Sequence, residues 1–236
     1  MIFNFPQIEL NKDNALVFTV YLPSLHEQLR SLWAPLSLQE KTQAKKFINS
    51  YLSERYIISH GLLRYLLAFY TKGNPQTIEY SFNEFGKPFL KNSRSKIQFN
   101  MSHSKDYAAY ILALDCQVGI DIEWRNNNID VQELSKLVLT KEEAIIFNEL
   151  NSERKLNAFY EVWTKKEAIL KAFGQGLSYP MTPIEIINTI ANLKDYYIAN
   201  NTKFYCSALT NLNDYSGAVA ITHEPREFIH TNLTSS

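Results

Sequence analysis

One residue pattern occurs in each half of this 236-residue chain, and it constrains the fold more than any other feature of the sequence. Both copies begin with the residues of a helix-capping box, Ser37–Glu40 in the first half and Thr140–Glu143 in the second. A Ser-Glu-Arg triplet and a long amphipathic helix follow, over Arg55–Tyr70 and Lys155–Phe173, and strand-like segments come after each helix. This repetition predicts a duplicated unit of roughly a hundred residues, a common domain size, although a chance match of two ordinary helix starts would look the same.

The other apolar segments alternate in the way that strands do, and no linker rich in Pro, Ser or Gly separates the two halves. The expected strands are Leu16–Leu22, Ile78–Phe82, Ile97–Asn100, Tyr107–Leu114, Gln117–Glu123, Lys203–Leu209 and Gly217–Thr222. The mixture of helices and strands predicts an α+β fold, with two similar β-α-β-β-β subdomains packed about a pseudo-twofold axis. We place the N-terminal subdomain at residues 1–106 and the C-terminal subdomain at residues 107–236.

The composition excludes several classes of protein. The chain has 24 Lys and Arg residues against 24 Asp and Glu residues, and 45% of its residues are hydrophobic, so it is neither disordered nor built to coat nucleic acid or an anionic membrane. Its two cysteines, Cys116 and Cys206, lack the spacing of a zinc site. We expect no signal peptide at the N-terminus, and the most apolar segment, Gly61–Tyr70, is too short to cross a bilayer. We therefore expect a cytoplasmic protein.

Two carboxylates in the segment Gly119–Glu123 form the first candidate site. Because side chains alternate along a strand, the two isoleucines of this segment would face a core, while Asp121 and Glu123 share the other face. Carboxylates so close together repel each other unless a cation lies between them, and a hard divalent ion such as Mg²⁺ suits oxygen ligands. The alternative is an edge strand with a solvated acidic face.

The segment Trp163–Lys171 places three functional side chains on one stripe of a helix. Trp163, Glu167 and Lys171 follow one another at intervals of four residues, which brings them to one face. Glu167 could complete a three-carboxylate metal site with the two strand carboxylates or act as a general base, and Lys171 could neutralise a phosphate as a point charge. The alternative is a surface Glu–Lys pair beside a tryptophan that packs in the core.

Two short motifs have the chemistry to bind an anion. Asn100–Ser104 offers hydroxyl groups and His103 at the end of a strand, where a phosphate oxygen could accept hydrogen bonds. A loop with a half-buried histidine is the plain alternative, and a catalytic triad is disfavoured because no Gly-x-Ser-x-Gly elbow is present. Gly86–Phe89 could present the Lys87 ammonium group to an anion or a purine edge. The sequence has neither a Walker A motif nor a Gly-x-Gly-x-x-Gly motif, which excludes a P-loop and leaves a Rossmann site unsupported.

Together, these motifs resemble those of one family, the 4'-phosphopantetheinyl transferases. Four segments occur in the order and rough spacing of that family: Gly86–Leu90 (GKPFL), Asn100–Ser104 (NMSHS), Val118–Glu123 (VGIDIE) and Phe159–Leu177 (FYEVWTKKEAILKAFGQGL). The length and the duplication are similar to those of the monomeric, pseudo-dimeric Sfp-type members. The resemblance covers about residues 15–225, and although each motif is weak alone, four in this order are specific.

The resemblance implies a Mg²⁺-dependent transferase. Such an enzyme moves the 4'-phosphopantetheine group from coenzyme A to a serine of an acyl or peptidyl carrier protein in fatty acid, polyketide or nonribosomal peptide biosynthesis, and releases 3',5'-ADP. The N-terminal subdomain would hold the adenine and 3'-phosphate, and the C-terminal subdomain the metal and the carrier. By the same resemblance, the metal ligands would be Asp121, Glu123 and Glu167. Lys171 would contact the pyrophosphate, and the other contacts to coenzyme A would come from Ser102, His103 and Lys87. The catalytic residues would be Glu167, Lys171 and Asp121.

The chain departs from the family pattern in the first-half helix. Many members have an arginine just before the glycine of this helix, where this chain has His60 before Gly61. If His60 takes over the contact with the 3'-phosphate, the affinity for coenzyme A should depend on pH near neutrality. Alternatively, the cation could come from Arg55, Lys41, Lys45 or Lys46. Two other functions stay open: another Mg²⁺-dependent phosphoryl-transfer enzyme or phosphodiesterase, and a module that binds coenzyme A or a carrier without catalysis. We expect a monomer with neither a nucleic-acid nor a membrane partner.

Overall fold

The computed structural model describes residues 3, 5–91, 95–174, 180–182, 184, 186, 196–199, 201–225 and 227–234. Helices and strands are mixed along the chain, as predicted for an α+β fold. The N-terminal half contains β1 (Asn14–Tyr21), η1 (Leu22–Gln28), α1 (Leu29–Trp33), α2 (Leu38–Lys46), α3 (Ser50–Thr71), η2 (Pro75–Thr77), β2 (Tyr80–Phe82), β3 (Pro88–Leu90), β4 (Ile97–Ser104) and β5 (Tyr107–Leu114). The C-terminal half contains β6 (Val118–Trp124), α4 (Val131–Val138), α5 (Lys141–Glu149), α6 (Ser152–Phe173), β7 (Tyr196–Ala199), β8 (Thr202–Ala208), β9 (Tyr215–Ile221) and β10 (Glu227–Leu233).

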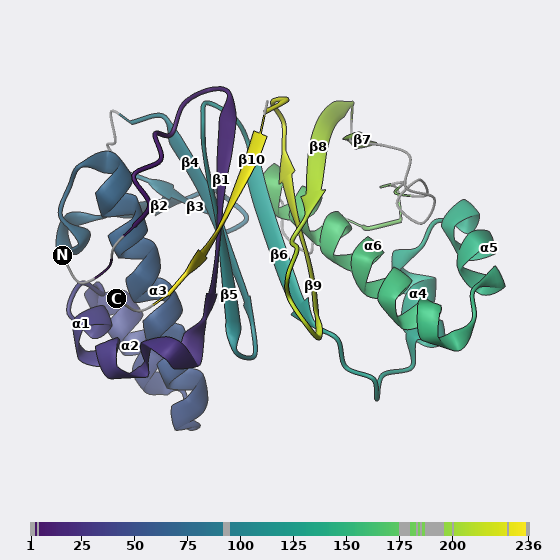
Figure 1. Cartoon of the computed structure of the whole chain (residues 1–236), viewed down its shortest axis with the longest axis horizontal. Helices are drawn as coiled ribbons and strands as arrows, with labels where there is room; N and C mark the ends of the chain where they lie inside the picture. Colours follow the sequence, from purple (N-terminus) through teal and green to yellow (C-terminus); the bar gives the residue numbers. More distant parts are fainter. Residues whose placement is uncertain are drawn as a thin grey trace.

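Two four-stranded sheets lie together at the centre of the molecule, and a long helix covers the outer face of each (Figure 1). The strand order is β10-β1-β5-β4 in one sheet and β6-β9-β8-β7 in the other, while β2 and β3 pair as a separate hairpin. Apolar side chains join α3 to the first sheet and α6 to the second. A third cluster, built from β1, β5, β6 and β9, fills the space between the two sheets. The layers are therefore helix, sheet, sheet and helix.

The two halves of the chain repeat one arrangement. In each half, a nine-residue helix begins with a complete capping box, and a 22-residue helix follows an asparagine N-cap. Both predicted capping boxes are thus confirmed. The corresponding strands also have the same order, β1-β5-β4 and β6-β9-β8. The long helices begin at Ser50 and Ser152, so the two Ser-Glu-Arg triplets are three residues out of register with each other.

Several boundaries differ from the prediction. β4 extends to Ser104, so the segment Asn100–Ser104 is the end of a strand and not a loop. β10 returns to pair in parallel with β1, which the sequence pattern did not indicate. The expected boundary at residue 106 falls just before β5, yet β5 pairs with β1 and β4, which precede that boundary. The division into subdomains 1–106 and 107–236 stays a prediction. Residues 175–177, at the end of the Phe159–Leu177 motif, lie outside the described residues.

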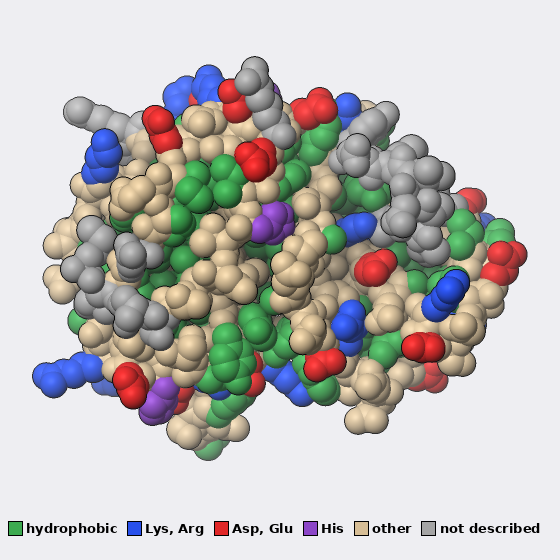
Figure 2. All heavy atoms as spheres, viewed as in Figure 1, with side chains coloured by type: hydrophobic (Ala, Val, Ile, Leu, Met, Phe, Trp, Pro, Cys, Tyr) green, Lys and Arg blue, Asp and Glu red, His purple; other side chains and the backbone are tan. Residues whose placement is uncertain are grey.

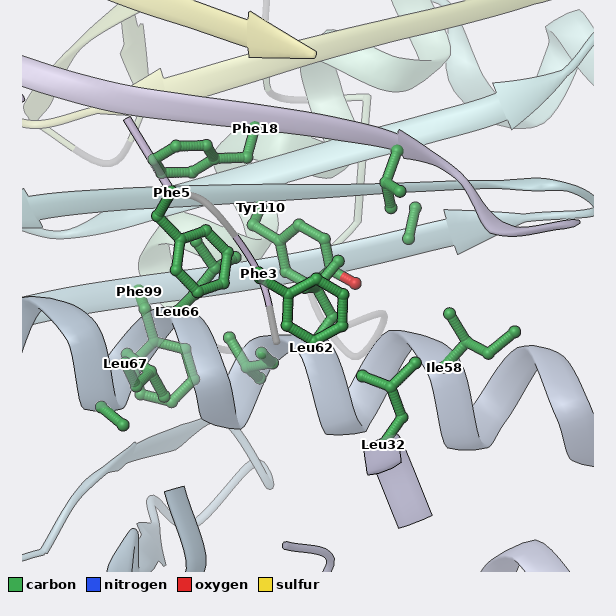
Figure 3. Packing of buried hydrophobic residues seen from close by; sticks show 14 of the residues in the cluster. Phe3, Phe5, Phe18, Leu32, Ile58, Leu62, Leu66, Leu67, Phe99 and Tyr110 are labelled. Carbon is green, nitrogen blue, oxygen red and sulfur yellow. The ribbon is translucent and has the colours of Figure 1, made fainter. Parts of the chain in front are cut away.

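The largest core lies between α3 and the first sheet (Figure 3). Phe18 and Tyr110 come from neighbouring strands and pack with Leu62 and Leu66 of the helix, and all four side chains are fully buried. The Tyr110 hydroxyl donates a hydrogen bond to the Ser59 carbonyl at 2.9 Å. This bond satisfies the one polar group that the ring brings into the core.

The surface carries no single dominant charge. On the face shown in Figure 2, acidic and basic side chains are interspersed, in line with the zero net charge of the chain. Among the described residues, no helix combines the length and the apolar sequence needed to cross a bilayer.

A buried ion pair joins the short capped helix to the long helix in each repeated unit. In the first unit, the capping-box residue Glu40 accepts a hydrogen bond from Arg64 Nε at 2.8 Å. In the second unit, Glu143 Oε2 lies 2.6 Å from Lys166 Nζ. Arg64 and Lys166 occupy the same position relative to the start of their helices. The two units are therefore built around equivalent polar contacts as well as equivalent apolar ones.

Glu40→Gln should remove part of the acid sensitivity of the protein. Burial alone would raise the pKa of this carboxyl group, but the nearby His60 ring and hydrogen bonds from Arg64 and Ser37 lower it from 4.5 to about 2. A carboxylate whose pKa is lowered by folding stabilises the fold above its unfolded pKa, and this contribution is lost as the pH falls from 4.5 toward 2. By urea unfolding, we expect the wild type to be about 3 kcal/mol more stable than the variant at neutral pH, and the two to converge near the folded pKa. A difference that stays constant over this range would contradict the assignment.

Candidate active site

The candidate site lies where the edge strands of the two sheets meet. β4 and β6 are edge strands, and the side chains on one face of β4 hydrogen-bond to β6. Because side chains alternate along a strand, every second residue of β4 shares this face. The bonds join Asn100 Oδ1 to the Ile120 amide (3.0 Å), Ser102 Oγ to Asp121 Oδ1 (2.9 Å) and Ser104 Oγ to Glu123 Oε2 (2.9 Å).

Helix α6 packs directly on β6 and brings the remaining side chains to the site. Gly119 makes this close packing possible, because a Cβ atom there would collide with the Ala168 carbonyl oxygen. The isoleucines of β6 point into the core between the sheets and its carboxylates share the opposite face, as predicted, and this is the face on which α6 packs. Glu167 and Lys171 lie one turn apart on the same side of α6.

Lys171 joins the helix to both strands. Its Nζ atom lies 2.6 Å from Asp121 Oδ1 and 2.9 Å from Ser102 Oγ. Asp121 is only 3% exposed, whereas the Lys171 side chain is 28% exposed, so the charge-assisted hydrogen bond between them lies at the edge of the buried region. The structure thus brings together the predicted residues Asp121, Glu167, Lys171 and Ser102.

The carboxylates of Asp121, Glu123 and Glu167 are here called the acidic cluster, and their negative charges repel one another. Burial, followed by the negative charge of Asp121, raises the pKa of Glu167 to about 7, although Lys171 opposes the rise. Burial and the same aspartate also raise the pKa of Glu123, despite a hydrogen bond from Ser104. A cluster with this electrostatic character favours a proton or a bound cation.

Two oxygens of the acidic cluster, Asp121 Oδ2 and Glu167 Oε1, are buried without a hydrogen-bond partner. Within the described ranges, no three Asp, Glu, His or Cys side chains are drawn together as a formed metal site, so the expected three-ligand site is not preassembled. Buried carboxylate oxygens without a partner are nevertheless unfavourable unless something binds them. Oxygen donors of this kind suit Mg²⁺, and the residues present therefore fit a divalent cation.

Two predicted anion-binding residues of the N-terminal half are held by neighbours within that half. Arg55 Nη2 and Nε lie 2.6 Å and 3.0 Å from one carboxylate oxygen of Asp106. The guanidinium group also lies 4.4 Å from the ring centre of Tyr51. His60 stacks on Tyr56, with the ring centres 4.0 Å apart. Arg55 is therefore already paired with an anion, and His60 also lies near one, because its Nδ1 atom is 3.8 Å from Glu40 Oε1.

His103 and Ser102 are neighbours in the motif, yet they face opposite sides of β4. Met101 packs on the α3 core, so the alternation of the strand directs His103 toward α3 and Ser102 toward β6. The His103 side chain is exposed at the surface, yet loss of hydration beside the surrounding protein, followed by repulsion from His60 and Lys171, lowers its pKa. His103 therefore lies within electrostatic range of both the α3 histidine and the active-site lysine.

Lys87 is bound to the backbone and not to the acidic cluster. Its Nζ atom donates hydrogen bonds to the carbonyl groups of Val118 (2.8 Å) and Ala172 (2.9 Å). Burial lowers the pKa of Lys87 to about 8. The expected contact of Lys87 with coenzyme A stays a prediction.

The sequence analysis missed three contributions to the site. Ser104 donates to Glu123 and also accepts from the Trp124 amide at 3.0 Å, and the two-residue period of the strand would have placed it beside Ser102. Asn100 binds the backbone of β6, which no local pattern indicates. Trp163 lies close enough to the Glu123 carboxylate to oppose the rise of its pKa, a contact that the helical stripe alone did not indicate.

Both halves of the chain are similar to proteins of one family. The profile of the 4'-phosphopantetheinyl transferase superfamily matches residues 117–220, and that of the 4'-phosphopantetheinyl transferase N-terminal domain matches residues 22–114. The chain is 31% identical over 186 residues to the 4'-phosphopantetheinyl transferase HetI of Nostoc sp., an alignment that covers 78% of each protein. It is 25% identical over 173 residues to the 4'-phosphopantetheinyl transferase Sfp of Bacillus subtilis, covering 72% of this chain and 75% of that protein. The crystal structure of Thermotoga maritima holo-[acyl-carrier-protein] synthase aligns with 46% of this chain and 63% of its own, at 17% identity and a TM-score of 0.33.

Proposed function

Because the chain belongs to the 4'-phosphopantetheinyl transferase superfamily, we propose that the acidic cluster between β4, β6 and α6 is its active site. Members of this family use coenzyme A to modify carrier proteins, and this chain is a phosphopantetheinyl transferase. One observation supports the location above all others: Lys171 binds Asp121 and Ser102 beside the unpaired oxygen Glu167 Oε1. A fixed cation and a buried carboxylate of raised pKa therefore lie together where the strands β4 and β6 meet helix α6.

The acidic cluster would hold Mg²⁺. Asp121 Oδ2 and Glu167 Oε1 have no other partner, and Glu123, which Ser104 holds in place, would supply the third ligand. The raised pKa values of the two glutamates support this assignment, because a cation between the carboxylates would offset their repulsion. When bound there, the ion would neutralise the pyrophosphate of coenzyme A and make its phosphorus easier to attack.

The protein's own side chains would move the proton and balance the charge. Transfer of a phosphoryl group requires positioning and charge neutralisation more than covalent help from the protein. Glu167 is buried within the acidic cluster, and we assign to it the removal of the proton from the serine hydroxyl of the carrier. Lys171, held by Asp121, would place a positive charge beside the leaving group, which departs as 3',5'-ADP.

We assign the 3'-phosphate and the adenine of coenzyme A to the N-terminal half. This assignment is supported by the family motifs and by the electrostatic proximity of His103 to both His60 and Lys171, which would let one substrate reach both groups. Arg55 would have to exchange Asp106 for the phosphate in order to take part. Since one chain supplies both sheets and both sides of the site, we propose that the enzyme acts as a monomer.

Intact-mass spectrometry tests the proposed function. The purified protein is incubated with coenzyme A, MgCl₂ and a panel of apo carrier proteins, and parallel reactions contain EDTA. We expect at least one carrier to gain the mass of one phosphopantetheine group, and the gain to be lost in EDTA. The modified carriers would identify the pathway as fatty acid, polyketide or peptide synthesis.

Three other outcomes would overturn parts of the proposal. A mass gain that persists in EDTA would contradict the metal site. Release of phosphopantetheine from coenzyme A without a carrier would indicate a phosphodiesterase. Binding of coenzyme A with no modification of any carrier would favour a module without catalysis.

A further inference from the structure

The turn between β2 and β3 is organised by one side chain. Asn83 Oδ1 accepts hydrogen bonds from the backbone amides of Phe85 (3.0 Å) and Lys87 (2.8 Å). The backbone amide of Asn83 donates a hydrogen bond to the Lys87 carbonyl at 3.0 Å. Gly86 closes the turn with a φ of +84°, a conformation that glycine adopts without strain. The turn is thus held in shape by its own hydrogen bonds, and it directs two side-chain donors outward.

Three hydrogen bonds run from this turn to the other half of the chain. Asn83 Nδ2 donates to the Gly174 carbonyl at 2.8 Å. Lys87 Nζ donates to the Ala172 carbonyl at 2.9 Å and to the Val118 carbonyl at 2.8 Å. Ala172 lies in the last turn of α6, Gly174 is its C-cap, and Val118 begins β6. One ammonium group therefore ties the end of the helix to the start of the strand.

The end of a helix is a favourable place for these donors. The last carbonyl groups of a helix have no partner within it and carry partial negative charge. The Lys87 side chain is half-buried at this end of the helix, and this burial lowers its pKa to about 8. Gly174 lets the turn approach, because a Cβ atom there would lie 2.8 Å from Asn83 Nδ2 and 2.9 Å from Lys87 Cδ.

The geometry points to Asn83 and Lys87 as positioning residues that fix the last turn of α6 on β6 and so hold Lys171 in the active site. Lys171 directly precedes Ala172, whose carbonyl oxygen Lys87 binds, and Asp121 lies on the strand that the same ammonium group binds. The 2.6 Å contact between Lys171 Nζ and Asp121 Oδ1 therefore depends on how the helix is set against the strand. A displacement of about 1 Å in a reacting geometry can reduce the rate about 100-fold. The inference rests on the proposed role of Lys171 in catalysis.

A positioning role differs from direct contact with coenzyme A in what it changes. The loss of a side chain that binds coenzyme A raises the Kd for this substrate. The loss of a side chain that positions Lys171 lowers kcat at saturating coenzyme A and leaves the Kd close to that of the wild type. A side chain that only stabilises the fold changes Tm, without changing kcat at temperatures where the protein stays folded.

Two variants and one control test the inference. Lys87→Met removes the ammonium group but keeps the length of the side chain. Asn83→Asp keeps the oxygen that organises the turn and replaces the donor to Gly174 by an acceptor. Lys91→Met, the control, removes a lysine from the end of the same hairpin, where it pairs with the exposed Glu79. For each protein, calorimetry gives the Kd for coenzyme A, transfer assays give kcat, and hydrogen exchange reports on the amides at the end of α6.

We expect Lys87→Met and Asn83→Asp to lower kcat about 10- to 100-fold and to speed hydrogen exchange at the end of α6, with little change in Kd. Lys91→Met should match the wild type in all three measurements. A large rise in Kd with kcat unchanged would overturn the inference in favour of direct contact with coenzyme A. A lower Tm with unchanged kcat in these variants would overturn the inference, because the turn would then only stabilise the fold.

Two further results keep the test decisive. If Lys87→Met does not fold, the milder Asn83→Asp variant decides between the outcomes above. If the wild-type protein transfers no phosphopantetheine, the proposed function is wrong. If hydrogen exchange at the end of α6 is unchanged in the variants, the turn between β2 and β3 does not hold the end of α6, and the inference is wrong.

Discussion

Glu167→Gln should lower kcat for phosphopantetheine transfer by about 100- to 10,000-fold, while the folded protein becomes no less stable. Glutamine keeps the shape of the side chain but removes both the base and the negative charge. Burial and repulsion from Asp121 raise the pKa of Glu167 from 4.5 to about 7. A carboxyl group whose pKa is raised by folding lowers stability as the pH rises from its unfolded to its folded pKa, and the deficit then stays constant. Glu167→Gln has no ionised carboxylate at this position, so at neutral pH it does not suffer this loss of stability.

Activity and stability are measured on the same samples. In EDTA, we expect the Tm of Glu167→Gln to equal or exceed that of the wild type. Added Mg²⁺ should raise the Tm of the wild type and have little effect on the variant, because a ligand that binds only the folded state stabilises it. Glu161→Gln changes an exposed glutamate of the same helix and should keep wild-type kcat. Turnover near the wild-type level in Glu167→Gln would contradict its assignment to the active site.

The parts of the site that the sequence predicted are those set by local patterns. β5 has the bounds expected for the strand Tyr107–Leu114, and the two-residue period correctly separated the isoleucines of β6 from Asp121 and Glu123. The contacts that complete the site are long-range. Lys171 and Asp121 are 50 residues apart, and Lys87 and Ala172 are 85 apart. No period in the sequence determines which sheet edges meet, so the side-by-side placement of β4 and β6 could not be predicted from it.

The repeat also explains why only one unit carries the proposed chemistry. Because the two long helices have the same length and the same start, Tyr65 and Phe69 of α3 occupy the positions of Glu167 and Lys171 of α6. These two aromatic side chains pack against phenylalanines of the N-terminal segment, with ring centres 5.2 Å and 5.4 Å apart. The helical face that is polar in one unit therefore belongs to the apolar core in the other. Duplication of the fold did not require duplication of the site.

Lys166→Met should destabilise the protein by about 3–5 kcal/mol. Lys166 Nζ donates to Glu143 Oε2 at 2.6 Å and to the Val138 carbonyl at 2.7 Å, and both charged side chains are fully buried. Methionine fills a similar space without a charge, so the Glu143 carboxylate would lose its cation in a place that water does not reach. An uncompensated buried charge is far more unfavourable than the loss of a hydrogen bond between neutral groups.

The double variant Lys166→Met/Glu143→Gln separates the effect of charge from that of packing. Glu143 Oε2 also accepts the Thr140 amide at 2.9 Å in the capping box, and the side-chain oxygen of glutamine can keep this bond. Since both charges are then absent, we expect the double variant to recover most of the free energy of unfolding that the single variant loses, as measured by urea unfolding. An equal loss in both variants would assign the effect to packing or to the Val138 contact. Because Lys166 directly precedes Glu167 on α6, this ion pair also fixes the helix that carries the active-site glutamate.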